Sequence, residues 1–185
     1  MRKAVSFALI LVFISAVGIS RAQEQRLAPD IKARVWFNAE PYKNRPSLKA
    51  MRGKVVLVFF WTLNDPNCES AAINLNQWYF KYRNKGLEIV GVHTPEWEFN
   101  KSESELFRKV DKLEILFPVA LDNDSSIRNA YGSLSWPSFF LVDRDGYIRG
   151  SYGGLYSFSD MRTMLEALLE ESGRQPRLGR ALKSI

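Results

Sequence analysis

The sequence predicts an α/β fold in which helices flank a central mixed sheet. Two unbroken apolar runs, Val55–Phe60 and Leu87–Val92, have the length and composition of strands that are buried on both faces. Apolar side chains recur at three- and four-residue spacing from Pro66 to about Arg83, which indicates an amphipathic helix between them. A strand, a helix and a strand in this order favour a right-handed parallel unit. A turn signal, D-R-D-G, separates Ser138–Val142 from Tyr147–Tyr152 and adds an antiparallel hairpin.

The first 22 residues have the pattern of a secretory signal. Arg2 and Lys3 precede an apolar stretch, and S-R-A at residues 20–22 is a small-x-small cleavage site. The apolar stretch is shorter than the ~20 residues that a membrane-spanning helix needs. We therefore expect cleavage before Gln23 and a periplasmic or secreted protein. The alternative is an uncleaved anchor, which would hold the protein at a membrane.

Charge and composition divide the rest of the chain. The full sequence has 26 Lys and Arg and 20 Asp and Glu. Residues 1–22 hold three of the basic residues, residues 172–185 hold four, and neither segment contains an acid. The excess of positive charge therefore belongs to the two ends, and no nucleic-acid partner is expected. We assign residues 23–33 to a linker, 34–171 to one domain and 172–185 to a basic, flexible tail.

The other elements of the domain follow from local patterns. Ser102 and Glu105 form a capping box at the start of a helix. Its apolar face is expected to carry Leu106, Phe107, Val110 and Leu113. Short strands are expected within Arg34–Asn38 and at Phe117–Leu121, and further helices at Asp124–Tyr131 and Phe158–Glu171.

The residues after the first buried strand carry the candidate chemistry. Asp65 and Pro66 open the helix, because Asp is a favoured N-cap and Pro suits the first helical position. Cys68 then lies in the first helical turn, at the carboxyl end of a central strand, where sites of open α/β sheets gather. It is the only cysteine of the chain, so it can form no intramolecular disulfide.

These motifs resemble the thioredoxin-like domains of TlpA- and DipZ-type proteins, a redoxin and thiol–disulfide interchange family. Such domains begin G-K-V-V-L-V-x-F-W-T-x-x-C-x-x-C. Here Cys68 is the second cysteine, Asp65 replaces the first, and Phe59 replaces the acid that often precedes F-W. Three more segments match in the same order: H-T-P-E-W-E-F, P-V-A-L-D-N-D and W-P-S-F-F-L-V-D-R-D-G. The resemblance implies a thioredoxin-like fold over about residues 36–169.

The resemblance also implies a peptide-binding groove. Pro137 matches the family's cis-proline, which faces the cysteine motif and lets bound peptide pair with the backbone just before it. Trp61 and Trp136 would flank this groove as an apolar surface, with a core position as the alternative for Trp61. The helix start favours a thiolate at Cys68, whereas the nearby carboxylate of Asp65 opposes it. We interpret Asp65 as a helix cap rather than as a catalytic acid or base.

No cofactor or metal is expected. A metal site generally needs three or four ligands, and His93 and Cys68 are the only histidine and cysteine of the chain. His93 is therefore interpreted as a structural residue.

Three functions remain open. The first is an exported protein of the thiol–disulfide oxidoreductase class with a degenerate D-P-N-C site. It would carry out at most monothiol exchange through Cys68, as a mixed disulfide with an exported protein or peptide client. The second is a non-catalytic module that binds such a client through the groove. The third, a one-cysteine peroxidase, ranks last because Trp61 and Asp65 stand where its motif has Pro and Thr.

Dithiol turnover is not expected. The thiol pKa of Cys68 distinguishes the first two, since a low value favours exchange and a high value favours the binding module.

Overall fold

The computed structural model describes residues 26–43 and 45–171. The predicted signal at 1–22 and the predicted tail at 172–185 lie outside the described residues. Within the described part of the chain, no helix combines the length and the apolar character needed to cross a membrane.

The described residues form one mixed sheet, which confirms the predicted fold class. Its strands are β1 (Trp36–Phe37), β2 (Val55–Trp61), β3 (Leu87–His93), β4 (Val119–Leu121), β5 (Ser138–Val142) and β6 (Ile148–Gly153). Their order is β1-β4-β3-β2-β5-β6. Strands β2, β3 and β4 are parallel, whereas β1, β5 and β6 each run antiparallel to a neighbour. The carboxyl ends of β2 and β3 therefore meet at one end of the sheet.

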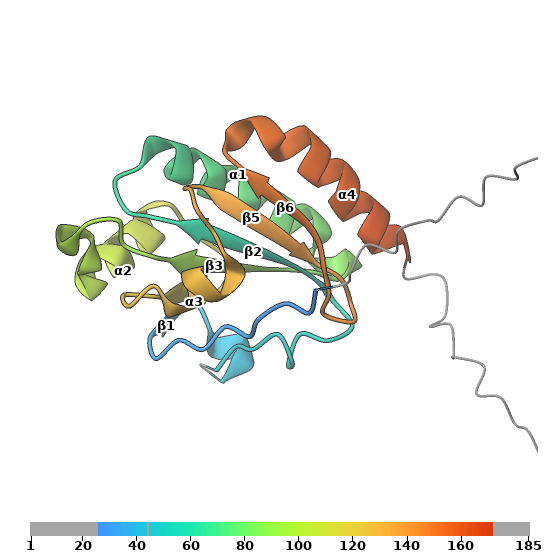
Figure 1. Cartoon of the computed structure of the whole chain (residues 1–185), viewed down its shortest axis with the longest axis horizontal. Coiled ribbons are helices and arrows are strands. Elements are labelled where there is room, and N and C mark those ends of the chain that lie inside the picture. The colour runs from blue at the N-terminus through green and yellow to red at the C-terminus, as the bar shows by residue number, and fades with distance from the viewer. Residues whose placement is uncertain (1–25, 44, 172–185) are drawn as a thin grey trace, which may run out of the picture.

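Helices cover both faces of this sheet. They are α1 (Pro66–Tyr82), α2 (Glu103–Lys112), α3 (Ser126–Tyr131) and α4 (Phe158–Glu170), with short 3₁₀ turns at η1 (Glu40–Tyr42), η2 (Arg83–Lys85), η3 (Glu98–Lys101) and η4 (Leu155–Ser157). Helices α1 and α4 lie on one face. Helix α3 lies on the other face, together with the N-terminal segment, the described residues before β2 (Figure 1).

Strand β2 shows why its sequence is an unbroken apolar run. All seven of its residues are buried. Leu57, Phe59 and Trp61 point into the core under α1 and α4, whereas Val58 and Phe60 point into the core under α3 and the N-terminal segment. Because a strand alternates its side chains, only a strand covered on both faces needs apolar residues at every position.

Helix α2 starts as predicted but buries a narrower face. The Ser102 hydroxyl accepts a hydrogen bond from the backbone N–H of Glu105 at 3.3 Å. Leu106 and Val110 are buried, one helical turn apart. The prediction is wrong for Phe107, which is 59% exposed. One residue further along the helix turns a side chain by about 100°, so Phe107 points away from the sheet and contacts Phe37 at the domain edge, with ring centroids 6.0 Å apart.

The N-terminal segment packs against the domain, so the predicted linker does not hold for residues 26–33. Leu27 forms a β-bridge with Tyr147. The Ala28 N–H donates to the Gly146 carbonyl at 2.9 Å. Ile31 is only 3% exposed. The backbone groups next to β6 are otherwise unpaired at the sheet edge, and this segment satisfies them.

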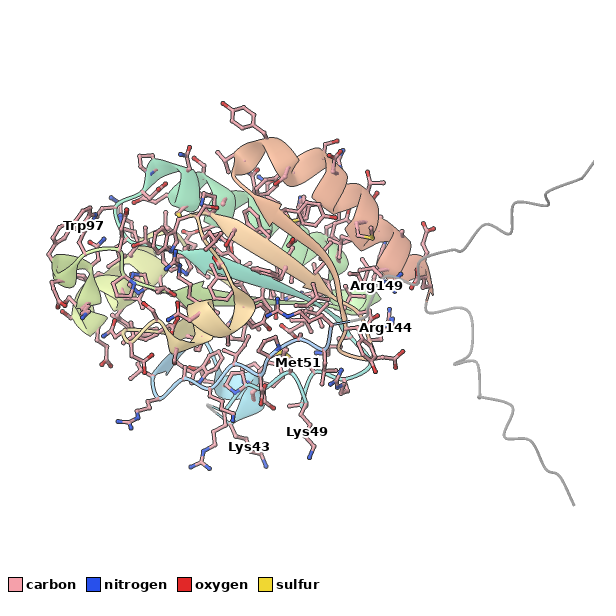
Figure 2. The ribbon with its side chains drawn as sticks, viewed as in Figure 1. Lys43, Lys49, Met51, Trp97, Arg144 and Arg149 are labelled. Carbon is pink, nitrogen blue, oxygen red and sulfur yellow. The ribbon has the colours of Figure 1, made fainter. Side chains whose placement is uncertain are left out.

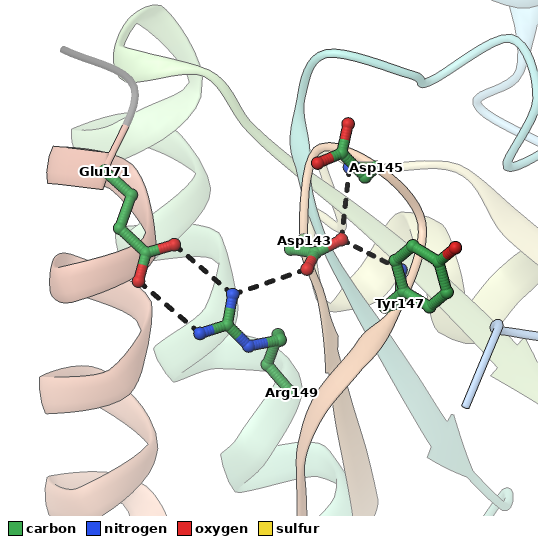
Figure 3. Close-up of polar contacts among 5 residues, drawn as sticks. All are labelled: Asp143, Asp145, Tyr147, Arg149 and Glu171. Carbon is green, nitrogen blue, oxygen red and sulfur yellow. Dashed lines mark hydrogen bonds and ion pairs between the residues drawn. The ribbon is translucent and has the colours of Figure 1, made fainter. Parts of the chain in front are cut away.

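The predicted hairpin turn is held by a single carboxylate, which also reaches α4. Asp143 accepts hydrogen bonds from the backbone N–H groups of Asp145 and Tyr147, at 3.1 and 2.8 Å (Figure 3). Its second oxygen lies 3.4 Å from Arg149, which also pairs with Glu171 just after α4 at 3.3 Å. These contacts fix the end of the molecule opposite to Trp97 (Figure 2).

Candidate functional site

The segment between β2 and α1 brings the D-P-N-C motif to the carboxyl ends of the parallel strands. Trp61 pairs with His93 in the parallel register. The Trp61 carbonyl accepts a hydrogen bond from the Thr94 N–H at 3.0 Å. Asn64 has a φ of 62°, a left-handed conformation that asparagine tolerates better than most residues. The chain therefore turns sharply just before the helix.

A buried amide that the sequence analysis missed holds this turn in place. Asn100 is 2% exposed and donates to the Leu63 carbonyl at 3.2 Å and to the Thr62 hydroxyl at 3.4 Å. Its side-chain oxygen accepts from the Asn64 amide at 3.2 Å. Thr62 also accepts from the backbone N–H of Glu96 at 3.3 Å. No local pattern marks Asn100, because its partners lie 36 to 38 residues away.

Asp65 is the N-cap of α1, as predicted. One of its carboxylate oxygens accepts hydrogen bonds from the backbone N–H groups of Asn67 and Cys68, at 2.7 and 3.0 Å. Its backbone is extended, as an N-cap requires, and Pro66 takes the first helical position. The carboxylate thus occupies the amides that would otherwise be free to stabilise a thiolate at the helix start.

Cys68 is a buried thiol with an unfavourable setting for ionisation. Its side chain is 0% exposed and belongs to the core under α1 and α4. The pKa of Cys68 is raised to about 12, chiefly by burial; the hydrogen bond with the Thr62 backbone lowers it, and the negative charge of Asp65 adds to the rise. Reactive cysteines are accessible and have lowered pKa values. Cys68 has neither property.

The aromatic residues of β2 are core residues. Trp61 is 0% exposed, so it takes the core position and does not line a surface groove. Phe59 is also 0% exposed and stacks on Phe139, with ring centroids 5.3 Å apart. The position where thioredoxins often carry a buried acid is therefore filled by an aromatic stack.

The loop before β5 is the other side of the candidate site. The Trp136–Pro137 peptide bond is cis. Ser138 pairs with Phe60 in the antiparallel register of β5 and β2. The neighbouring residues Pro137 and Trp61 therefore lie opposite each other. The Pro137 carbonyl accepts from the Gly154 N–H at 2.9 Å, and Pro137 itself is buried. Trp136 is half-buried, and its backbone makes no hydrogen bond to another described residue. This backbone is thus available to a bound chain.

His93 is enclosed beside the site and has no hydrogen-bond partner. It is 0% exposed, and neither ring nitrogen is paired in the described structure. Its ring meets the Trp61 ring edge-on at 5.5 Å. Burial lowers the pKa of His93 to about 4. Among the described residues, no three His, Cys, Asp or Glu side chains gather as metal ligands.

A buried acid, also missed from the sequence, fixes the loop that leads into α3. Asp122 is 2% exposed and accepts hydrogen bonds from the Thr94 hydroxyl at 2.9 Å and from the N–H groups of Ile127 and Arg128 at 3.0 Å. Burial raises its pKa. Asp122 thus ties the end of β3 to α3, and it sets the position of Arg128.

Large apolar side chains are exposed around this end of the molecule. Trp97, at the start of η3, and Phe99, within it, are 59% and 67% exposed, and Trp97 lies at the tip of the domain in Figure 2. Leu134, two residues before Trp136, is 89% exposed. Exposed apolar side chains near one site are typical of a surface that contacts another protein or peptide.

Comparison with known proteins agrees with this architecture. Residues 25–151 match the AhpC/TSA family. Protein DipZ of Mycobacterium bovis is 34% identical over 157 residues, which cover 84% of this chain but only 22% of DipZ. The thiol-disulfide oxidoreductase ResA of Bacillus thuringiensis is 28% identical over 145 residues, 76% of this chain and 81% of ResA.

Solved structures show the same fold. A thiol-disulfide isomerase from Corynebacterium glutamicum superposes with a TM-score of 0.68 at 26% identity, covering 78% of this chain and 97% of that chain. A thioredoxin-like superfamily protein gives a TM-score of 0.70 at 24% identity, with 78% and 96% covered. The fold is therefore thioredoxin-like, the similar proteins include thiol-disulfide oxidoreductases, and the chain belongs to the AhpC/TSA family.

Proposed function

We propose that this protein is an exported member of the thiol–disulfide oxidoreductase class that has lost dithiol chemistry and binds an extended peptide segment of a client. The observation that carries the proposal is the state of Cys68, which is fully buried with a pKa raised to about 12. A high pKa is the property that favours a binding module over monothiol exchange. Export is supported by the basic and apolar pattern of residues 1–22.

The missing first cysteine removes the chemical step that a reductase needs. A thiolate that attacks a disulfide leaves a mixed disulfide, and a second thiol close by must release it. Asp65 has no sulfur, and its carboxylate is already bound to two backbone amides. Cys68 is the only cysteine of the chain, so the sequence holds no resolving thiol.

The binding surface of the proposal is the loop before β5. The Trp136 backbone N–H and C=O make no hydrogen bond to another described residue, whereas the Pro137 carbonyl is held by the Gly154 N–H. An extended peptide can hydrogen-bond to such a backbone segment as an added strand. Leu134, two residues before Trp136, and Trp97, in the segment after β3, offer exposed apolar side chains. The groove therefore uses Trp136 but not Trp61.

Alkylation of Cys68 by iodoacetamide tests this proposal. With a pKa of about 12, the thiolate population at pH 8 should be about a thousandfold below that of a free cysteine, whose pKa is ~8.5. The folded protein should therefore react about a thousandfold more slowly than the same protein in urea, which is the matched control. The folded protein should also fail to catalyse insulin reduction with dithiothreitol.

Two results would contradict the proposal. Alkylation in the folded state at a rate close to that in urea would make Cys68 a reactive thiol and favour monothiol exchange. Robust insulin reduction by the wild-type protein would show that the D-P-N-C site retains turnover.

A further inference from the structure

A charged side chain is held against the proposed binding surface without an opposing charge. The Arg128 guanidinium lies over the Trp136 ring, 4.2 Å from its centroid. Its Nε is buried without a hydrogen-bond partner, and Arg128 forms no ion pair with a described residue. An arginine stacked on an aromatic ring keeps its outer N–H groups available to bind a carboxylate.

The backbone of Arg128 is fixed at both ends, so the side chain is presented from a rigid position. Its N–H donates to the buried Asp122 carboxylate at 3.0 Å, and its carbonyl accepts from Ser133 at 3.2 Å. The chain after α3 then leads directly to Trp136, whose backbone makes no hydrogen bond to another described residue. Arg128 therefore stands beside the segment on which the proposed peptide would pair.

A second basic feature lies next to the residues that precede the D-P-N-C motif. A pocket of about 300 Å³ next to Leu63 and Asn64 is lined by three basic side chains and one acid: Arg108, Lys109, Lys112 and Glu105. Three neighbouring acids are already engaged. Asp65 caps α1, Glu69 pairs with Lys109 at 2.5 Å, and Glu98 pairs with Lys101 at 2.6 Å. Lys109 is therefore engaged as well, and Arg108 and Lys112 are the pocket cations that form no ion pair with a described residue.

From these charges we infer that the peptide bound at Trp136 carries an acidic residue, whose carboxylate pairs with the Arg128 guanidinium. This inference rests on the proposed function and adds to it the class of client: an extended segment with Asp or Glu next to the residue that pairs with Trp136. The basic pocket at Asn64 would attract further acidic residues of the same segment.

A peptide array can test this inference with the full-length protein. The array holds decapeptides in many flanking sequences, each made in three forms that differ only at the central residue: Glu, Gln or Lys. A charge-assisted pair should make the Glu form bind about tenfold more tightly than the matching Gln form. The Lys form should bind most weakly. Raising the salt concentration should reduce the preference for Glu.

Three variants make the assignment specific. Arg128→Gln should remove the preference for Glu over Gln, measured as the ratio of the two affinities within this one variant. Arg128→Lys keeps the charge but loses the planar stack on Trp136, so it should retain only part of the preference. Arg83→Gln is the matched control, because Arg83 also lies over a ring, that of Phe80 at 5.8 Å, but at the opposite end of α1.

The outcomes separate the two proposals. If the wild type binds none of the peptides, the proposed docking function fails and this inference fails with it. If it binds Glu and Gln forms equally, docking stands and the acidic preference is overturned. An unchanged preference for Glu in Arg128→Gln would overturn the role of Arg128. Near-ultraviolet circular dichroism and the Arg128→Lys variant distinguish a lost contact from a lost fold.

Discussion

Acidification should destabilise the protein through His93, the only histidine of the chain. His93 is fully buried on β3, both of its ring nitrogens lack a partner in the described structure, and burial lowers its pKa from 6.5 to about 4. The unfolded chain therefore binds one more proton than the folded chain between these two pH values. The stability that the neutral His93 contributes is fully present above pH 6.5 and is lost as the pH drops toward 4.

The size of the effect follows from the two pKa values. A difference of about 2.5 pKa units corresponds to about 3 kcal/mol, since one unit is ~1.4 kcal/mol. Just under 2 kcal/mol of this should be lost between pH 7 and pH 5 by the linkage relation. This is a large part of the ~5–15 kcal/mol that stabilises a typical domain.

Urea unfolding between pH 4 and pH 7.5 measures this loss, with His93→Gln as the reference protein. The variant should be less stable at pH 7, because a buried amide replaces the ring, but its stability should change less on acidification. Asp122, whose pKa burial raises, contributes in the opposite direction and is present in both proteins, so its effect cancels in the difference. Parallel pH profiles for the two proteins would refute the neutral, buried state of His93.

Three further predictions concern the D-P-N-C site. Asp65→Asn keeps the cap but removes the charge. The alkylation rate of Cys68 in the folded protein should rise only slightly, because burial is the larger cause of its high pKa. A rise close to the rate in urea would show that the charge dominates. Asp65→Cys should give slow but measurable insulin reduction at a cost of about 1 kcal/mol for the lost cap, and a folded variant without activity would show that the groove has diverged as well. Adding Phe59→Asp to Asp65→Cys supplies an acid but breaks the stack with Phe139. Urea unfolding should therefore show a loss of at least ~3–5 kcal/mol in the free energy of unfolding. A well-folded double variant with faster insulin reduction would show that the core accepts the acid.

The sequence by itself determined the elements that local physics specifies. An apolar run without interruption predicts a strand covered on both faces, and β2 and β3 match the predicted positions closely. Asp65 followed by Pro66 determines where α1 begins, because capping involves only the residues of one helical turn. The position of the D-P-N-C motif at the start of α1 could be predicted for the same reason.

The tertiary structure alone decided which candidate side chains are accessible. A tryptophan after a buried strand is compatible with the core or with a groove, and Trp61 is buried because it shares its face of β2 with Phe59 and lies under α1. The N-terminal segment has no apolar periodicity, and its packing depends on backbone groups at the β6 edge.

The tertiary structure also decided which polar residues belong to the site. Asn100 joins the D-P-N-C turn from η3, more than thirty residues away, and Arg128 covers Trp136 across the turn that follows α3. The sequence shows each of these residues but not its partner. Contacts of this kind depend on how separate segments are brought together by the sheet, and local propensity and spacing carry no information about that arrangement.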